Sequence, residues 1–485
     1  MSDVENKQVK ETTIPVEEVV FSLYQSQDKI YPKSISGVFT NWRWVMVWLT
    51  QLFFYGVPWL EWGKRQAMLF DLETKRFFIF GLVFNPQDLI YLSFLLIVSA
   101  LSLFLFTAVA GRLWCGYTCP QTVYTEIFLW IENKIEGDRN VRIKLDQSSL
   151  SPHKVFRKTL KHSVWIVFAL WTGFTFVGYF TPIRELFVSL THFKLSSWET
   201  FWICFYGFAT YGNAGFMREQ VCKYMCPYAR FQSAMFDKDT LIVTYDEVRG
   251  EPRGVRSKKA GENKSLGACV DCHLCVQVCP TGIDIRKGLQ YECIGCGLCA
   301  DACDVMMDKM GYERGLIKYS TQNGMTNRWS RQQMIQRVLR PRVFIYAGVL
   351  TTLIVGLAIS LYLKPSYRVD VMRDRAVIAR ITDDNMIENV YRIKIMNNAE
   401  EAQRFKIQAT GDSQLNVEFE ETGLAPIDKA EKLLMLEAGE TKTMIIEIKV
   451  PDSVLRAGSY PIAFNVKSLS SQEATTEKSA FIVTN

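Results

Sequence analysis

Histidine is scarce in this sequence, and cysteine is missing from its last part. Only 4 of the 485 residues are His, and none lies inside a long apolar stretch. A b-type haem bound within a membrane needs paired His ligands inside apolar helices, so such a haem is not expected. All 13 Cys lie between Cys115 and Cys303. We therefore expect a metal-binding section followed by a section without thiols.

Two further features are absent. The first apolar run begins after residue 40 and has no small-residue cleavage site behind it, so no signal peptide is predicted. No tract combines Lys and Arg with aromatic residues, so a nucleic-acid partner is not expected. Residues 1–37 are polar and lack apolar periodicity, which predicts a mobile N-terminal arm.

Long apolar stretches, in contrast, recur along the chain. Five of them carry no charge and have roughly the length that a helix needs to cross a bilayer. Trp and Tyr gather at their ends, as at a membrane interface. We predict membrane spans at Trp44–Leu60, Leu89–Gly111, Ser163–Ile183, Thr200–Met217 and Val343–Leu363.

The basic residues between these stretches set an orientation. Segments 112–162 and 218–342 hold nine and twenty Lys and Arg, whereas loops 61–88 and 184–199 hold four and two. Because cytoplasmic loops are enriched in Lys and Arg, the two basic segments are predicted to be cytoplasmic. The N-terminus is then inside the cell and the C-terminus outside, and the lipid bilayer is a partner.

A dense run of cysteine lies in the second basic segment. It repeats the spacing C-x2-C-x2-C-x3-C. Bacterial ferredoxins with two [4Fe–4S] clusters share this spacing, and the fourth Cys of each motif ligates the cluster of the other motif. We therefore predict two clusters, the first held by Cys269, Cys272, Cys275 and Cys303 and the second by Cys293, Cys296, Cys299 and Cys279.

The spacing disfavours two other interpretations of this run. Four-thiolate zinc sites usually draw two C-x2-C pairs from separate hairpins. Disulfides need an oxidising compartment, whereas the predicted orientation places the run in the reducing cytoplasm. One departure from the ferredoxin pattern is visible, because Pro280 follows the first motif and Asp304 follows the second. The ligands are unaffected by it.

A second cysteine constellation repeats the motif C-x3-C-P. Pro is favoured at the first position of a helix, so the Cys before each Pro is expected at an N-cap, where the helix dipole lowers a thiol pKa. Nearby Arg112 and Arg218 would favour thiolates further. Four soft sulfurs suit Cu(I) best, and a zinc site, a redox-active dithiol pair or structural thiols are alternatives. The predicted copper ligands are Cys115, Cys119, Cys222 and Cys226.

After the last apolar stretch the pattern changes to short runs of alternating residues. Examples are 391–395, 415–419, 444–450 and 460–466, separated by turn residues. They predict an antiparallel β-sandwich of immunoglobulin size, with no Cys, no His and no acid–base pair. Docking or assembly is the expected role of this part.

The predicted fold is thus a polytopic α-helical membrane protein with an inserted two-cluster bacterial ferredoxin-like domain and a C-terminal all-β, immunoglobulin-like sandwich. The expected parts are the cytoplasmic arm 1–37, four spans with the first C-x3-C-P motif in 38–217, the cytoplasmic segment 218–342 with the second motif and the ferredoxin-like domain, the fifth span 343–363, and a periplasmic sandwich 364–485.

Together these features resemble the FixG/RdxA family of cytochrome c oxidase accessory proteins, also called CcoG. The stretches Gly111–Gln121 and Arg65–Asp71 look typical of that family, and the resemblance extends from about residue 30 onward. It implies a bacterial inner-membrane protein that assists assembly of a cbb3-type oxidase and reduces Cu(II) to Cu(I) for its copper centre. Oxidase subunits or copper chaperones are the implied partners.

The hypothesis from residues and resemblance is a cupric reductase, in which a cytoplasmic electron donor reduces the clusters and they reduce copper held at the C-x3-C-P motifs. One alternative is an electron carrier between a cytoplasmic donor and a quinone or membrane reductase, as in NapH-like proteins. Another is a non-catalytic assembly scaffold. The two C-x3-C-P motifs are expected either to meet within one chain or to pair with their own copies in a homodimer.

Overall fold

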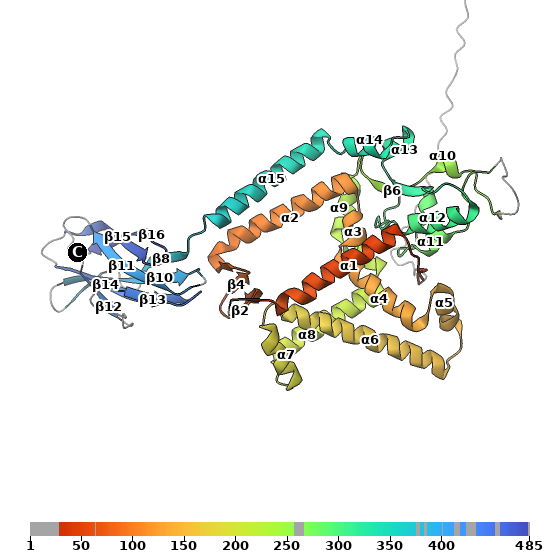
Figure 1. Cartoon of the computed structure of the whole chain (residues 1–485). Helices are drawn as coiled ribbons and strands as arrows, with labels where there is room; N and C mark the ends of the chain where they lie inside the picture. The colour runs from red at the N-terminus through yellow and green to blue at the C-terminus, as the bar shows by residue number, and fades with distance from the viewer. Residues whose placement is uncertain are drawn as a thin grey trace, which may run out of the picture.

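The computed structural model describes residues 29–63, 65–256, 266–374, 379–382, 386–399, 401–411, 418–422, 433–451 and 456–483. Most of the predicted arm (residues 1–28) lies outside these ranges. Figure 1 shows three parts: a β-sandwich, a helical middle, and an end that carries the cysteine-rich segment. The sandwich and the cysteine-rich end lie at opposite ends of α2 (Leu89–Ala110) and α15 (Pro341–Tyr362).

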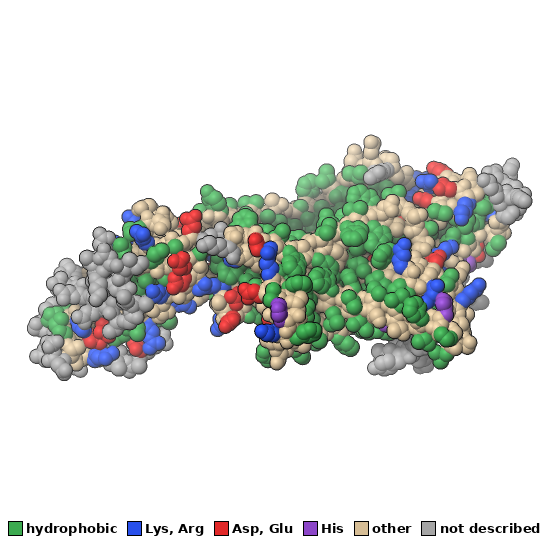
Figure 2. Space-filling model, turned by 60° about the horizontal axis from the view of Figure 1, so that its bottom comes forward, with side chains coloured by type: hydrophobic (Ala, Val, Ile, Leu, Met, Phe, Trp, Pro, Cys, Tyr) green, Lys and Arg blue, Asp and Glu red, His purple; other side chains and the backbone are tan. Residues whose placement is uncertain are grey.

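Three helical stretches in the described ranges are long and apolar enough to cross a membrane. They are Pro86–Ala110, Pro152–Val177 and Pro341–Tyr362, and they contain most of three of the five predicted spans. On the face drawn in Figure 2, hydrophobic side chains gather over the helical middle, and charged side chains are more frequent toward the two ends. The polytopic prediction is therefore supported in part.

The other two predicted spans differ from the expectation. The first belongs to α1 (Val38–Gly56), an apolar helix that also carries the buried Arg43. The fourth begins with α8 (Ser197–Thr210), whose 14 residues extend roughly 21 Å, short of the roughly 30 Å of a bilayer core. A π-helical segment, η3 (Tyr211–Met217), continues it. Hydropathy alone did not reveal this change of helix type.

The helices of the middle pack closely. Gly173 on α6 (Pro152–Val177) lets α8 approach, because a Cβ there would lie 2.3 Å from the carbonyl oxygen of Ile203. His153 and His162, which the sequence placed outside the apolar stretches, lie on α6, where Tyr211 contacts His162 at 2.9 Å. Further elements of this part are η1 (Val57–Trp59), η2 (Pro86–Asp88), α3 (Leu113–Tyr117), α4 (Pro120–Glu136), α5 (Arg139–Gln147), α6 (Pro152–Val177), α7 (Ile183–Thr191), η4 (Val221–Met225) and α9 (Pro227–Met235).

A buried ionic network joins α4 to the segments around it. Glu132 is fully buried and accepts hydrogen bonds from Arg142 at 3.1 Å and from Arg218 at 2.9 Å. Burial by itself would raise the pKa of Glu132, but Arg218, Lys161 and Arg142 hold it below its ordinary value. The carboxylate thereby fixes Arg218, at the start of the second C-x3-C-P motif, against the helix of the first.

The cysteine-rich end is closed by a two-stranded antiparallel sheet that the sequence did not indicate. Strand β6 (Ile242–Tyr245) pairs with β7 (Ile317–Ser320), so the segments before and after the cysteines lie side by side. The helical elements here are α10 (Glu247–Gly250), α11 (Leu274–Gln277), η6 (Ile285–Lys287), α12 (Leu298–Met310), α13 (Gln322–Thr326) and α14 (Arg331–Gln336).

Residues 29–37, expected to belong to the mobile arm, pack against α5 and the cysteine-rich end instead, where the amide of Lys33 donates a hydrogen bond to the carbonyl oxygen of Gln277 at 2.8 Å. Lys29 and Tyr31 both contact the carboxylate of Asp146, at 2.8 and 2.7 Å. The buried Asp301 on α12 accepts hydrogen bonds from the backbone and side chain of Thr40, both at 2.8 Å. A carboxylate at the N-terminus of a helix satisfies its free amides, so Asp301 caps α1 from a distant part of the chain.

Small sheets precede α2 on the side of the sandwich. Arg76 donates a hydrogen bond to Thr441 at 2.9 Å, and Asn85 donates one to Asn398 at 2.6 Å, so this region touches the sandwich directly. The strands are β1 (Glu61–Trp62), β2 (Arg65–Gln66), β3 (Met68–Asp71), β4 (Arg76–Ile79) and β5 (Leu82–Phe84), in a two-stranded sheet β1-β2 and a three-stranded sheet β3-β4-β5.

The predicted β-sandwich is present. One sheet has the order β12-β14-β10-β8 with β9 beside β10, and the other has the order β13-β11-β15-β16. Alternate residues along the strands of both sheets point inward and form the core, where Tyr391, Phe405 and Phe464 are fully buried. Of the predicted run 415–419, residues 415–417 lie outside the described ranges. The strands are β8 (Tyr367–Arg373), β9 (Arg380–Ile381), β10 (Met386–Asn397), β11 (Gln403–Gly411), β12 (Glu418–Thr422), β13 (Leu433–Leu436), β14 (Thr441–Pro451), β15 (Gly458–Ser468) and β16 (Ala474–Val483).

Candidate metal centres

Two adjoining cavities lie among the eight ferredoxin-type cysteines. The first cavity is the one beside Cys269. Apart from its cysteines, most of its wall is apolar and includes Tyr245, Met307 and Leu316. An apolar wall limits the access of water, which influences the potential of a redox cluster. The first cavity is lined by the four cysteines that the sequence assigns to the first cluster, Cys269, Cys272, Cys275 and Cys303.

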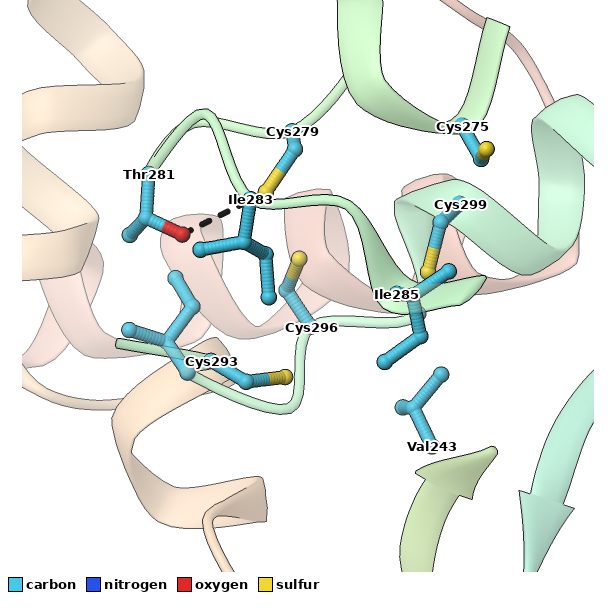
Figure 3. Close-up of a pocket in the computed structure, with 11 residues that line it drawn as sticks. Val243, Cys275, Cys279, Thr281, Ile283, Ile285, Cys293, Cys296 and Cys299 are labelled. Atoms are coloured by element: carbon cyan, nitrogen blue, oxygen red, sulfur yellow. Dashed lines mark hydrogen bonds between the residues drawn. The ribbon is translucent and has the colours of Figure 1, made fainter. Parts of the chain in front are cut away.

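The second cavity is lined by the four cysteines assigned to the second cluster. Figure 3 shows their sulfur atoms turned toward the space between them. Thr281 contacts the sulfur of Cys279 at 3.3 Å. Cys275 lines this cavity as well as the first, so one residue borders both spaces. The cysteines of the second set are Cys293, Cys296, Cys299 and Cys279.

The two cysteine loops share a backbone conformation but differ in sequence. Gly295 and Gly297 in the second loop have φ of +65° and +75°. The matching positions of the first loop are occupied by Asp271 and His273, with φ of +50° and +56°. Side chains rarely adopt this left-handed region, which costs roughly 1–2 kcal/mol per residue. The first loop is therefore strained where the second is not.

Arg286 contacts both residues that occupy left-handed positions in the first loop. Its guanidinium pairs with the carboxylate of Asp271, contacts Nδ1 of His273 at 2.9 Å and pairs with Asp284 at 2.7 Å. Only 4% of the Arg286 side chain is exposed. This residue was not predicted from the sequence. The sequence did contain a signal: the two loops have the same cysteine spacing, but two positions that are Gly in the second loop are Asp and His in the first.

The C-x3-C-P motifs adopt the local structure that the sequence predicted. Cys119 is the N-cap of α4 and Cys226 is the N-cap of α9, and a Pro follows each one. Cys115 lies on the short helix α3, and Cys222 lies on the π-helical segment η4. π-Helical turns are rare in proteins, and those that occur often lie at functional sites.

The two motifs meet within one chain. Gln121, at the start of α4, donates a hydrogen bond to the carbonyl oxygen of Arg218 at 3.0 Å. Arg112 donates one to the carbonyl oxygen of Ala229 on α9, also at 3.0 Å. The fully buried Gln232 on α9 places its amide nitrogen 3.4 Å from the sulfur of Cys115. Side chains of each motif thus reach the other.

The predicted lowering of the thiol pKa is wrong for Cys115, Cys119 and Cys222. Burial raises the pKa of Cys115 to about 11 and that of Cys222 to about 12, and it also raises the pKa of Cys119 despite the amides of Thr122 and Gln121. Arg218 is turned toward Glu132 rather than toward the thiols. Loss of water from around the sulfurs therefore outweighs the helix dipole. A bound cation is what would make thiolates here.

Within the ranges that the structure describes, no three His, Cys, Asp or Glu side chains are gathered to hold one metal ion. This holds for the eight ferredoxin-type cysteines, as expected of a cubane whose thiolates each bind a different iron. It also holds for the four C-x3-C-P thiols, which form no ready-made single-ion site. Copper ligation there stays a prediction.

The first C-x3-C-P motif lies directly against the second cysteine loop. A Cβ at Gly116 would be 2.9 Å from Cα of Cys296. Arg112 donates a hydrogen bond to the carbonyl oxygen of Cys293 at 3.0 Å. Cys115 also packs against the group of buried apolar residues that contains Ile294. The C-x3-C-P motifs are thus immediate neighbours of the second cavity.

A third cavity lies between the two motifs and the second loop. Arg43, which is 2% exposed and pairs with Glu126 at 2.8 Å, forms part of its wall. Cys222 lines it from the second motif, and Thr281 lines it from the ferredoxin-like part. Polar groups therefore reach the space beside the second set of cysteines.

Comparison with known proteins agrees with this layout. Residues 217–322 match the family of 4Fe-4S dicluster domains, and residues 92–137 match a family of 4Fe-4S binding domains. Residues 357–484 match the IG-like fold at the C-terminus of FixG. The nitrogen fixation protein FixG of Rhizobium meliloti is 37% identical over 421 residues, which cover 80% of each chain. The chain belongs to the FixG/RdxA family.

Two further members are similarly related. The protein RdxA of Cereibacter sphaeroides is 39% identical over 416 residues, covering 84% of this chain and 87% of RdxA. The protein RdxB of the same organism is 37% identical over 407 residues, covering 82% of this chain and 85% of RdxB. As a member of this family, the chain is an iron–sulfur electron-transfer protein with an immunoglobulin-like C-terminal domain.

Proposed function

We propose that this FixG/RdxA family member is a membrane-bound electron-transfer protein that reduces Cu(II) to Cu(I) and assists assembly of the copper centre of a cbb3-type oxidase. The observation that carries the proposal is the row of cysteine sets: two adjoining cavities with four cysteines each, and four more thiols in the motifs against the second cavity. Such a row is suited to carrying single electrons over a distance rather than to storing metal.

The proposed cluster ligands follow the cavities. Cys269, Cys272, Cys275 and Cys303 hold one [4Fe–4S] cluster, and Cys293, Cys296, Cys299 and Cys279 hold the other. The donor set fits, because burial raises the pKa of Cys296 and Cys303 to about 12, so that only a bound cation leaves these sulfurs as thiolates. When bound, each cluster takes up and releases one electron at a time.

The exposure of the residues gives the route a direction. Cys272 is exposed, so a cytoplasmic one-electron donor can approach the first cysteine set. Cys275 borders both cavities. Cys115, on the far side of the second cavity, packs against the group of buried apolar residues that includes Cys296. One electron enters from the donor and one leaves to Cu(II), which becomes Cu(I). No covalent bond forms or breaks, and no proton is required.

The proposed topology has this end in the cytoplasm of a bacterium and the sandwich in the periplasm, with the apolar helices in the inner membrane. The cysteine-rich end and the sandwich lie at opposite ends of α2 and α15, which supports the arrangement (Figure 1). Arg340, at the start of α15, pairs with Asp237 at 3.0 Å and reaches the carbonyl oxygen of Ala108 at 2.6 Å. The two helices are thus joined at the cysteine-rich end.

Copper is the substrate of the proposed reaction rather than a resident ion. The four C-x3-C-P thiols are the sequence-based choice for holding Cu(I), and soft sulfur suits that ion. They are not gathered around a single point in the described structure. The proposed function therefore depends on electron delivery to copper and leaves the identity of the copper ligands to a separate test.

The test uses purified full-length protein in detergent, without oxygen. The reduced protein is desalted and mixed with Cu(II) and a coloured Cu(I) chelator. Cys272→Ser and Cys296→Ser, each removing a ligand of a different cluster, should abolish most Cu(I) formation. Cys204→Ser is the matched control, because Cys204 is an exposed thiol outside every motif, and it should react like the wild type. Equal Cu(I) from all four proteins would mean that free thiols, not clusters, reduce copper.

A further inference from the structure

The number of cysteines within the matched regions exceeds what two clusters need. The stretch 92–137 matches a 4Fe-4S binding domain but contains only Cys115 and Cys119. The dicluster match, 217–322, contains ten cysteines, and eight of them belong to the two ferredoxin motifs. The two left over are Cys222 and Cys226. A cubane needs four thiolates, and the two surplus pairs together supply four.

The two motifs that carry these four cysteines are held together in the fold. Hydrogen bonds from Gln121 to the Arg218 carbonyl and from Arg112 to the Ala229 carbonyl clamp the two motifs together from both sides. Gln232, six residues after Cys226, reaches the sulfur of Cys115. The motifs also repeat one another in sequence, and each contributes one N-cap thiol and one thiol from the helical segment before it, α3 or η4.

The surroundings suit a group that is anionic overall. The α4 and α9 helices, of 17 and 9 residues, both begin at a ligand cysteine, and their N-terminal amides favour negative charge. Arg112 supplies a nearby cation. Gln232 is fully buried, and both polar atoms of its side chain contact the Cys115 sulfur, the nitrogen at 3.4 Å and the oxygen at 3.6 Å. A buried amide aimed at a sulfur tunes a cluster as a hydrogen-bond donor.

A single ion fits this place less well. In the described part of the chain the four thiols do not form a single-ion site, and the eight ferredoxin-type cysteines give the same result. None of the 13 cysteines is in a disulfide in the structure.

We propose that Cys115, Cys119, Cys222 and Cys226 ligate a third [4Fe–4S] cluster. Each thiol gives up its proton on ligating iron. Gly116 and Arg112 then hold this third ligand set in contact with the second, so three ligand sets follow one another from the exposed Cys272 to the C-x3-C-P motifs. The presence of this third cluster does not depend on the proposed reduction of copper. Only its role as the last electron carrier before copper rests on that proposed function.

The experiment counts iron and acid-labile sulfide in full-length protein that is reconstituted without oxygen and cleared of loose iron. The wild type should contain about 12 iron and 12 sulfide per chain, against about 8 of each for two clusters. The double variant Cys119→Ser/Cys226→Ser should lose about four of each. Cys204→Ser should lose none.

A second variant keeps the test decisive if the double variant misfolds. Gln232→Leu removes only the amide beside the Cys115 sulfur. It should retain about 12 iron while shifting the reduction potential and the electron paramagnetic resonance signal of one cluster out of three. About 8 iron in the wild type, or an unchanged count in the double variant, overturns the third cluster. Twelve iron with no Cu(I) formation would instead overturn the copper function alone.

Discussion

Arg286 should decide whether the first cysteine loop keeps its cluster. Asp271 and His273 occupy left-handed positions that cost roughly 1–2 kcal/mol each. Arg286 holds both of them and Asp284. Removing one partner of a buried ion pair costs about 3–5 kcal/mol, and because the two carboxylates are partly exposed we expect the lower end, about 3 kcal/mol, for Arg286→Ala.

The assay follows cluster absorbance during anaerobic unfolding in guanidinium chloride. With a slope of about 3 kcal/mol per molar for a small domain, the midpoint for loss of the first cluster should fall by about 1 M. Adding Asp271→Gly and His273→Gly to Arg286→Ala should recover about 2 kcal/mol, because the strain is removed together with its compensation. The second loop already has Gly at both positions and should be unaffected.

Arg314→Ala is the matched control. Arg314 lies on the same part of the protein and pairs with Asp308, but both side chains are largely exposed, so this variant should leave the midpoint unchanged. A structural role for Arg286 is refuted if Arg286→Ala behaves like Arg314→Ala. If the two glycine substitutions lower the midpoint further, Arg286 does not compensate for backbone strain.

Three other predictions test contacts between parts of the chain that are distant in sequence. Gly116→Ala should destabilise the protein by about 1–3 kcal/mol in denaturant unfolding, because its Cβ would press on backbone of the second loop, whereas Gly212→Ala, with nothing within 4 Å, should have no such effect. Asp301→Ala should cost about 1–2 kcal/mol and increase hydrogen exchange at the start of α1; unchanged exchange there would exclude a capping role. Although burial raises the pKa of Asp146, hydrogen bonds from Lys158 and Lys29 hold it below its ordinary value. Its contribution to stability is therefore present above the ordinary pKa of an Asp and is lost as the pH falls below it. The protection of residues 29–34 against hydrogen exchange, relative to the intrinsic exchange rate at each pH, should fall under acid in the wild type. In Asp146→Asn this protection should already be low at neutral pH.

Much of the candidate site could be predicted because its signals are local. The C-x2-C-x2-C-x3-C spacing fixes which thiols can reach one cubane, and the structure lines its two cavities with the predicted sets. Pro120 and Pro227 mark helix starts, so the N-cap positions of Cys119 and Cys226 followed from sequence. The alternating runs after residue 364 indicated the sandwich for the same reason.

What could not be predicted depends on distant contacts. Asp301 caps α1 from 261 residues away, and no spacing in the sequence records that pairing. The raised thiol pKa values result from burial, which a sequence does not show. The helix that carries the fourth apolar stretch becomes π-helical at Tyr211, a change that leaves the hydropathy unaltered.

The most direct test of the central claim follows both redox partners in one reaction. Protein reduced without oxygen and freed of reductant is mixed with Cu(II), and the return of cluster absorbance is recorded together with Cu(I) captured by a coloured chelator. The proposed function predicts that the clusters are reoxidised as Cu(I) appears, with one Cu(I) formed for each electron lost. Clusters that stay reduced while no Cu(I) forms would contradict it, and clusters that are reoxidised only when a quinone is added would identify a different electron acceptor.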